Sequence, residues 1–288
     1  MRLDSAWFTH PGGHPQNEDA LRLDVGADRA WAVVCDGLGG MGGGAQAAAI
    51  CADAIAAALR DGASMGLPQS PAAGREPPPG GVGAAGRGGS QVPTSGPAAP
   101  GAPPLGSQTV SVPDAVAAAV LDGHAALVAA REDQPALRQA QSTAAVAVVE
   151  GGDLTWANVG DSRIYRFNGH RLAGASLDDS AGYAAFRRGE VDHEGIRLYD
   201  GRSRLTAALG DDPSPEPHTG QAALAEGDAV LVCSDGFWQY VWDLEMEIDL
   251  AKADTAADWL ELMLLRLVQR SRLDGDNLTA AAWMVRSG

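Results

Sequence analysis

The sequence predicts an α+β fold, in which strand-forming and helix-forming segments are grouped instead of alternating regularly. Short apolar or alternating runs fill residues 3–36 and recur from residue 143 onward. Helix-like stretches of small and apolar residues follow the first group of strands, and a further one precedes the last strand. Two sheet-forming halves that each contribute at least one helix favour α+β over a parallel sheet built from βαβ units.

Three strands and two helices are predicted before residue 132. LDSAWFTH (3–10) and ALRLDVG (20–26) have strand-like patterns, and AWAVVCD (30–36) is apolar and short enough for a buried strand. The next segment, AQAAAICADAIAAALR (45–60), has the small and apolar residues of a packed helix. PDAVAAAVLDGHAALVAAR (113–131) predicts a second helix, because proline is favoured in a first helical turn.

From residue 143 the pattern is mainly that of β-structure. Residues 143–176 form a series of short runs separated by GGD, GDS and NGH, and the Asn-Gly pair at 168–169 predicts a hairpin. DAVLVCSDG (228–236) repeats the strand-then-Asp-Gly design of AWAVVCDG. A long amphipathic helix is predicted at about 255–270, and TAAAWMV (279–285) supplies the last strand.

Length and charge narrow the class of protein. The 288 residues are expected to form a single domain, 1–288, and a hydrophobic content of 45% is typical of a globular protein. The net charge of −16 argues against nucleic acid or an anionic membrane as a partner. Without a signal-peptide pattern or an uncharged run of membrane-spanning length, we expect a cytoplasmic protein, and we expect it to be monomeric. Cys35, Cys51 and Cys233 have no metal-ligand spacing and are predicted to be reduced, buried thiols.

An abrupt change of composition marks a predicted disordered insertion at about 62–112. Residues 71–110 contain ten Gly, nine Pro, seven Ala and three Ser, which cannot bury enough apolar surface to offset the entropy of ordering. We interpret the segment as a flexible loop inserted between two helices of one domain. A PxxP-type ligand or a regulatory tether is the alternative.

The glycine-rich stretch WAVVCDGLGGMGGG (31–44) raises the question of a nucleotide site. A P-loop requires a Lys after its glycines, and this stretch continues with Ala45 and Gln46. A dinucleotide fingerprint places the glycines directly after the strand, whereas Asp36 stands there and would repel a pyrophosphate. A nucleotide loop is therefore disfavoured.

Acidic residues recur at the ends of apolar segments, and this pattern predicts a metal site. Strand-end carboxylates converge at one edge of a sheet, and clustered oxygen ligands suit Mg²⁺ or Mn²⁺. Glycines directly after two of these aspartates, Gly37 and Gly236, would allow backbone to approach an ion. Each of these acidic residues alone is also typical of an ordinary turn, so it is their recurrence that predicts a metal site. They are Glu18, Asp19, Asp36, Asp161, Asp235 and Asp276.

The chain resembles the metal-dependent protein serine/threonine phosphatases, the phosphatase 2C group, in their bacterial form. The resemblance covers nearly the whole chain outside the insertion and keeps the order of the family's blocks. Those blocks are NEDA (17–20), CDGLGG (35–40), STAAVAVV (142–149), VGDSRIYRF (159–167), LTAALG (205–210), VCSDGFW (232–238) and DNLTAAAW (276–283).

The resemblance implies a fold and a set of metal ligands. The fold would be a four-layer α-β-β-α sandwich of two antiparallel sheets, with the metals at one end. Asp36 would bridge two Mg²⁺ or Mn²⁺ ions, Gly37 would give its carbonyl to one ion, and Asp235 and Asp276 would hold the other. Glu18 would reach a metal through water, Asp19 would lie in the inner or second coordination shell, and Asp161 would support a weakly bound third ion.

The implied reaction is hydrolysis of phosphoserine or phosphothreonine in a phosphoprotein, the target of a serine/threonine kinase. Asp36, Asp235 and Asp276 would be the catalytic set, because two ions that share a carboxylate lower the pKa of a bridging water. The resulting hydroxide would attack phosphorus in line without a covalent phosphoenzyme. The expected cofactors are two Mg²⁺ or Mn²⁺ ions and a weak third ion.

Two positions depart from the family pattern. His14 stands where members usually have an arginine that clamps the substrate phosphate, and a histidine cannot form the two-pronged contact. His14 and Arg163 are the predicted phosphate-binding residues, with Arg202 or Arg204 as alternatives. Leu38 replaces a histidine of eukaryotic relatives, as is common in bacterial members, so that leaving-group protonation would fall to water or another side chain.

The segment at about 178–204 corresponds to the family's variable flap, with a short helix predicted at AGYAAFRRG (181–189). Two rival functions stay open. A phosphatase-like binding or regulatory module with weakened turnover is motivated by His14, and a phosphatase for small phosphomonoesters would use the same metal site.

Overall fold

The computed structural model describes residues 1–39, 43–62, 111–271 and 275–287. Nearly all of the predicted insertion at 62–112 lies outside these residues, as do three glycine-stretch residues, 40–42. The described part contains two antiparallel sheets. One sheet has the strand order β1-β11-β10-β7-β8, and the other has β2-β3-β5-β6-β9, with β4 paired to β3.

The strands of the first sheet come from both ends of the chain and from its middle. They are β1 (Arg2–His10), β7 (Arg163–Asn168), β8 (Arg171–Ala175), β10 (Ala229–Cys233) and β11 (Leu278–Arg286). The strands of the second sheet are β2 (Asp19–Val25), β3 (Arg29–Leu38), β4 (Gln141–Ser142), β5 (Ala144–Glu150), β6 (Asp153–Val159) and β9 (His218–Ala223).

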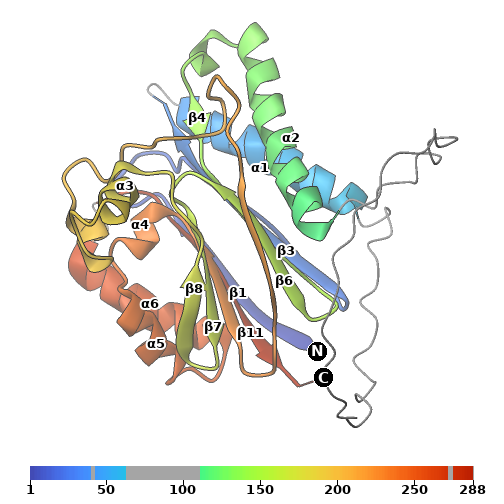
Figure 1. Cartoon of the computed structure of the whole chain (residues 1–288), viewed down its shortest axis with the longest axis vertical. Coiled ribbons are helices and arrows are strands. Elements are labelled where there is room, and N and C mark those ends of the chain that lie inside the picture. The colour runs from blue at the N-terminus through green and yellow to red at the C-terminus, as the bar shows by residue number, and fades with distance from the viewer. Residues whose placement is uncertain (40–42, 63–110, 272–274, 288) are drawn as a thin grey trace, which may run out of the picture. The chain divides into compact units, whose positions relative to one another are not determined.

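Helices cover the outer face of each sheet (Figure 1). On the second sheet lie α1 (Gly43–Gly62), which contacts β3, and α2 (Val112–Asp133), which contacts β6. On the first sheet lie α4 (Asp235–Trp238), α5 (Asp243–Leu250) and α6 (Ala256–Ser271). Helix α3 (Ala181–Arg187) and the 3-10 turns Pro135–Leu137 and Glu194–Leu198 complete the described elements.

Strand β3 shows why the sequence forms these layers. Ala32 and Val34 point into the apolar layer between the sheets, whereas Trp31, Val33 and Cys35 point into the layer beneath α1 and α2. Because side chains alternate along a strand, a strand buried on both faces must be apolar throughout. A third apolar layer lies between the other sheet and its helices. These three layers confirm the predicted α-β-β-α sandwich.

Helix α2 is long and apolar enough, by length and composition, to cross a membrane, and it is the one such helix among the described residues. In this fold its inner face packs against α1. A Cβ added to Gly123 would lie 2.8 Å from Cγ1 of Ile55, so glycine permits the close approach of the two helices. The three cysteines are buried and unbridged, as predicted.

Candidate metal centre

The sandwich gathers acidic residues from distant parts of the sequence around one pocket of about 270 Å³. Asp36 lies near the end of β3, Asp161 lies in the turn between β6 and β7, and Asp235 begins α4 directly after β10. Glu18 and Asp276 precede β2 and β11. All five line the pocket, so the strand-end pattern of the sequence marks carboxylates that do come together.

Asp19 lies beside this pocket rather than in its lining. The register of β2 against β3 places Asp19 opposite Asp36. Oδ2 of Asp19 accepts a hydrogen bond from Oγ of Ser234 at 2.8 Å, and its Oδ1 is buried without a hydrogen-bond partner among the described residues. Asp19 therefore supports the cluster from behind.

Burial and mutual repulsion oppose ionisation of the cluster. Desolvation, followed by the charge of Asp235, raises the pKa of Asp19 to about 7. Desolvation, followed by the charge of Asp276, raises the pKa of Asp235 to about 6. The pKa values of Asp36 and Asp161 are also raised well above the usual range, first by burial and then by the neighbouring carboxylates. Such a set is unstable as a group of anions unless cations offset it.

The residues present fit divalent cations. The ligand atoms are oxygens, which suit Mg²⁺ and Mn²⁺. Oδ1 of Asp235 is buried and accepts no hydrogen bond from the described residues, so it retains full capacity to bind a cation. The lining of the pocket contains no Lys, Arg or His among the described residues that could compensate the carboxylates instead.

The two glycines that follow Asp36 and Asp235 are required by close backbone contacts. A Cβ on Gly37 would lie 2.0 Å from the carbonyl oxygen of Gly44, and one on Gly236 would lie 2.1 Å from the carbonyl oxygen of Asn277. A Cβ on Gly44 would lie 2.6 Å from the carbonyl oxygen of Gly37 and 2.7 Å from Oε2 of Glu18. The Gly37 carbonyl and the Glu18 carboxylate thus face the same space.

Several polar residues position the acidic ones, and the sequence pattern gave no role to them. The Asp36 N–H donates to Oγ1 of Thr143 at 2.9 Å, and the Glu18 N–H donates to Oδ1 of Asn277 at 2.7 Å. Nε2 of Gln239 donates to Oδ2 of Asp235 at 2.6 Å. Asn277 directly follows Asp276, so adjacency to a predicted ligand was an available signal for it, whereas Thr143 stands in the STAAVAVV block, beside no predicted ligand.

The geometry contradicts the predicted phosphate-binding role of Arg163. Its guanidinium donates to both carboxylate oxygens of Asp178, at 2.9 and 2.6 Å, and to the Tyr165 hydroxyl at 2.9 Å. It also lies 3.4 Å from the ring centroid of Trp238, and the side chain is only 2% exposed. Arg163 is therefore a buried structural residue that ties β7 to the start of the flap.

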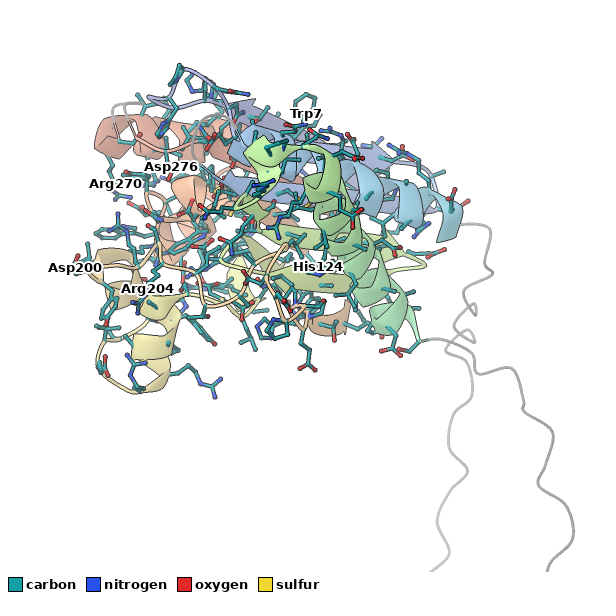
Figure 2. The ribbon with its side chains drawn as sticks, turned by 90° about the horizontal axis from the view of Figure 1, so that it is seen from above. Trp7, His124, Asp200, Arg204, Arg270 and Asp276 are labelled. Carbon is teal, nitrogen blue, oxygen red and sulfur yellow. The ribbon has the colours of Figure 1, made fainter. Side chains whose placement is uncertain are left out.

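His14, in contrast, lies at the rim of the acidic cluster. Its Nε2 is 3.8 Å from Oδ1 of Asp276, and its side chain is 56% exposed. Arg202 approaches from the flap, where its Nε donates to Oε1 of Gln239 at 3.2 Å. Arg204 is exposed on the side of the molecule that carries Asp276 (Figure 2).

The flap is anchored to the body by an ion-pair cluster. Its short helix α3 forms within the predicted stretch 181–189, and Ser203 near the end of the flap lines the acidic pocket together with the next segment's Leu205. Arg197 is buried and pairs with Asp243 at the start of α5, while Nδ1 of His193 lies 3.2 Å from the same carboxylate. Although burial alone would raise it, these partners lower the pKa of Asp243 to about 2.

Comparison with known proteins identifies the family. The sequence model of protein phosphatase 2C matches residues 10–281. The chain belongs to the protein phosphatase 2C family. This phosphatase 2C chain is 29% identical over 125 residues to the serine/threonine phosphatase stp of Listeria monocytogenes serotype 4b (strain F2365). That alignment covers 43% of the chain and 50% of the relative, so the chain matches about half the length of this curated protein.

Solved structures share the fold over the whole phosphatase 2C chain. The serine/threonine phosphatase Stp1 from Staphylococcus aureus aligns with a TM-score of 0.74 at 22% identity, covering 100% of this chain and 96% of the other. The catalytic domain of the phosphatase PstP, in complex with two manganese ions, aligns with a TM-score of 0.71 at 20% identity, covering 99% of both chains. At these identities the likeness supports the fold, and it confirms the predicted class.

Proposed function

We propose that this chain is a phosphoprotein phosphatase that hydrolyses phosphoserine and phosphothreonine with two Mg²⁺ or Mn²⁺ ions. The observation that carries the proposal is the convergence of Glu18, Asp36, Asp161, Asp235 and Asp276 on one pocket whose described lining contains no Lys, Arg or His. The name of the Listeria relative and the two manganese ions of the PstP complex agree with it. The cytoplasmic location, the monomeric state and an opposing kinase stay predictions.

The family resemblance implies a role for each acidic residue. Asp36, at the end of β3 and opposite Asp19, would bridge the two ions, and the Gly37 carbonyl would join Glu18 on one side. Asp235 and Asp276 would hold the second ion, and Asp161 would support a weaker third. Thr143, Asn277 and Gln239 fix these ligands through the hydrogen bonds described above.

Bound divalent ions supply a hydroxide nucleophile near neutral pH and offset the charge that develops on the phosphoryl group. The chain itself shapes the pocket: Ser203, near the end of the flap, and the adjoining Leu205 form part of its wall, and Leu38 forms another part. Five carboxylates would repel a phosphate dianion in the absence of metal. Substrate binding should therefore depend on the ions as strongly as the chemical step does.

The test is metal-dependent hydrolysis of a phosphothreonine peptide and of p-nitrophenyl phosphate. Asp36→Asn should abolish turnover at saturating Mn²⁺, and Asp122→Asn, an exposed change on α2, should leave it intact. Full activity in EDTA, or in Asp36→Asn, would contradict the proposal. Phosphopeptide binding without turnover would favour the regulatory module instead, and hydrolysis confined to small metabolites would favour the phosphomonoesterase.

A further inference from the structure

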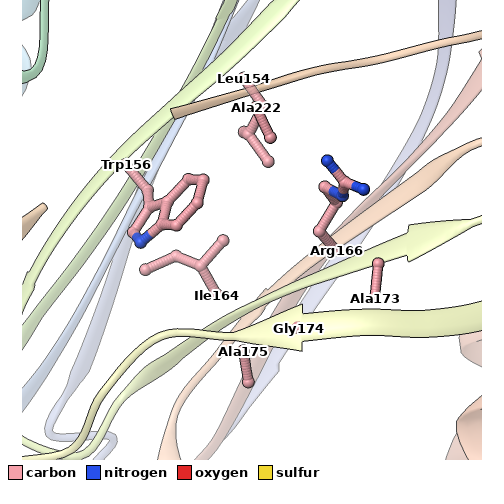
Figure 3. A pocket seen from close by; sticks show the side chains of 8 residues that line it. All are labelled: Leu154, Trp156, Ile164, Arg166, Ala173, Gly174, Ala175 and Ala222. Carbon is pink, nitrogen blue, oxygen red and sulfur yellow. The ribbon is translucent and has the colours of Figure 1, made fainter. Parts of the chain in front are cut away.

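A second pocket, of about 220 Å³, lies between the two sheets and shares no residue with the metal centre. Figure 3 shows its two walls. Leu154 and Trp156 of β6 and Ala222 of β9 form one wall, and Ile164 and Arg166 of β7 face them from the other sheet. Residues 173–175 of β8 complete the pocket, which we call the inter-sheet cleft.

The cleft stays open because small residues surround its two large side chains. Trp156 pairs with Gly220 in the neighbouring strand, and a Cβ on Gly220 would lie 2.1 Å from Cζ2 of Trp156. The indole therefore lies directly over Gly220. Opposite Arg166, Gly174 has no atom within 4 Å of the position of a Cβ, so the space beside it is unfilled.

Arg166 is a charged residue at an inward-facing position. Its strand neighbours Tyr165 and Phe167 belong to the outer apolar layer, while Ile164, two residues away, belongs to the layer between the sheets. Because strand side chains alternate, Arg166 shares the face of Ile164, and Figure 3 shows its guanidinium directed into the cleft.

The Arg166 guanidinium has no hydrogen-bond or ion-pair partner among the described residues. Its cross-strand neighbours are Val230 and Gly174, neither of which offers a side-chain acceptor. Every other described arginine that is at least half-buried has an acceptor, as Arg163 has Asp178 and Arg202 has Gln239. In a chain of net charge −16, this half-buried cation without a protein anion is an exception.

We propose that the inter-sheet cleft binds a small carboxylate with a flat apolar body. A guanidinium recognises a carboxylate through two parallel hydrogen bonds, while the walls of Leu154, Ile164 and Ala222 and the Trp156 ring suit an aromatic or planar apolar group. An apolar cavity of about 150 Å³ holds benzene. The larger cleft therefore matches a bicyclic ring that bears one carboxylate.

The cleft is lined by the two strands that flank one turn of the metal centre. Strands β6 and β7, which supply Trp156 and Arg166, are joined by the turn that carries Asp161. The ligand would thus contact both strands that flank one of the metal-centre carboxylates, without touching a residue of the acidic pocket.

The test is calorimetric titration of 2-naphthoate into the full chain loaded with Mn²⁺. We expect one site with a dissociation constant below about 1 mM. Arg166→Met keeps the apolar stem of the side chain and should weaken binding at least about tenfold, the effect of losing a charge-assisted pair. Arg187→Met, which removes an exposed charge from α3, should leave the affinity unchanged.

Two further probes separate binding in the inter-sheet cleft from binding at the metal ions. Neutral 2-naphthamide should bind about tenfold more weakly than 2-naphthoate, and Ala222→Phe should block the cleft and remove binding while Arg166 is retained. Circular dichroism and thermal unfolding of each variant check that it folds. Absence of binding at millimolar 2-naphthoate would overturn the proposal. Equal affinity of Arg166→Met and the unaltered chain for 2-naphthoate would also overturn the proposal. Binding that does not depend on Arg166 would mean that the carboxylate is held elsewhere, such as at the metal ions.

Discussion

Replacing Asp235 by Asn should stabilise the metal-free protein while removing its response to metal. The Asp235 carboxyl is buried, and desolvation together with the charge of Asp276 raises its pKa from 3.8 to about 6. A shift of roughly two units corresponds to about 3 kcal/mol of cost for the ionised form. Asn removes this charge and keeps a side-chain carbonyl that can accept the Gln239 amide.

The pH dependence follows from the direction of the shift. Because the folded carboxyl has the higher pKa, the folded state binds more protons than the unfolded state between about pH 4 and pH 6. The Asp235 contribution is therefore most favourable below pH 4 and is lost as the pH rises through 6. The advantage of Asp235→Asn should be about 1 to 3 kcal/mol at pH 8 in EDTA and should shrink toward pH 4.

Urea unfolding in EDTA at pH 8 and pH 5 measures the effect, with Asp122→Asn as the exposed control. In thermal unfolding, 1 kcal/mol corresponds to a shift of about 2–4 °C for a protein of this size. Addition of Mn²⁺ should stabilise the unaltered chain more than the variant and reverse the order of stability. A variant that is less stable than the unaltered chain at pH 8 in EDTA, or one that gains equally from Mn²⁺, would refute the electrostatic reasoning.

Three further predictions concern residues around the centre. Arg163→Met should lower the free energy of unfolding by about 3–5 kcal/mol in urea, because it leaves Asp178 buried without its partner; a loss below about 1 kcal/mol would show that the pair is unimportant. The stabilising contribution of Asp243, whose pKa is lowered to about 2, should be complete above about pH 4 and disappear between pH 4 and pH 2. Acid unfolding of Asp243→Asn against the unaltered chain measures this, and an unchanged difference across that window contradicts it. His14→Arg should lower the KM for p-nitrophenyl phosphate about tenfold at saturating Mn²⁺ by adding a two-pronged donor, whereas an unchanged KM would place residue 14 outside the phosphate site.

The layers of the fold could be predicted where a segment is buried on both faces or has a clear helical period. β3, β10 and α6 carry such patterns and form as expected, within one or two residues at their ends. β9 and α5 were not anticipated. The sequence of β9, HTGQAA, belongs to an edge strand whose side chains alternate between half-buried and exposed, so its apolar signal is weak. The acidic sequence of α5 resembles that of a loop, and only the structure shows that its own residues Met246 and Leu250 are buried in the apolar layer.

The acidic centre could be anticipated because each carboxylate stands beside a strand end, a position that the sequence pattern marks. The residues that hold these carboxylates carry no such mark. Thr143 and Asn277 are ordinary strand-entry residues by composition, and their roles appear only when β3 meets β5 and the Glu18 segment meets β11. Sequence reasoning therefore reached the clustered acidic residues and missed the polar residues that hold them in place.

Arg163 and Arg166 show where prediction from the strand pattern stops. Three residues apart on β7, they must lie on opposite faces, and this much follows from the alternation. The alternation does not say which face supplies an anion. Asp178, fifteen residues further along, folds back onto Arg163, while the opposite sheet presents Trp156 and Ala222 to the cleft that Arg166 enters. Arg163 is thus paired within the protein, whereas Arg166 has no protein partner among the described residues and can bind a ligand. This difference depends on tertiary contacts alone.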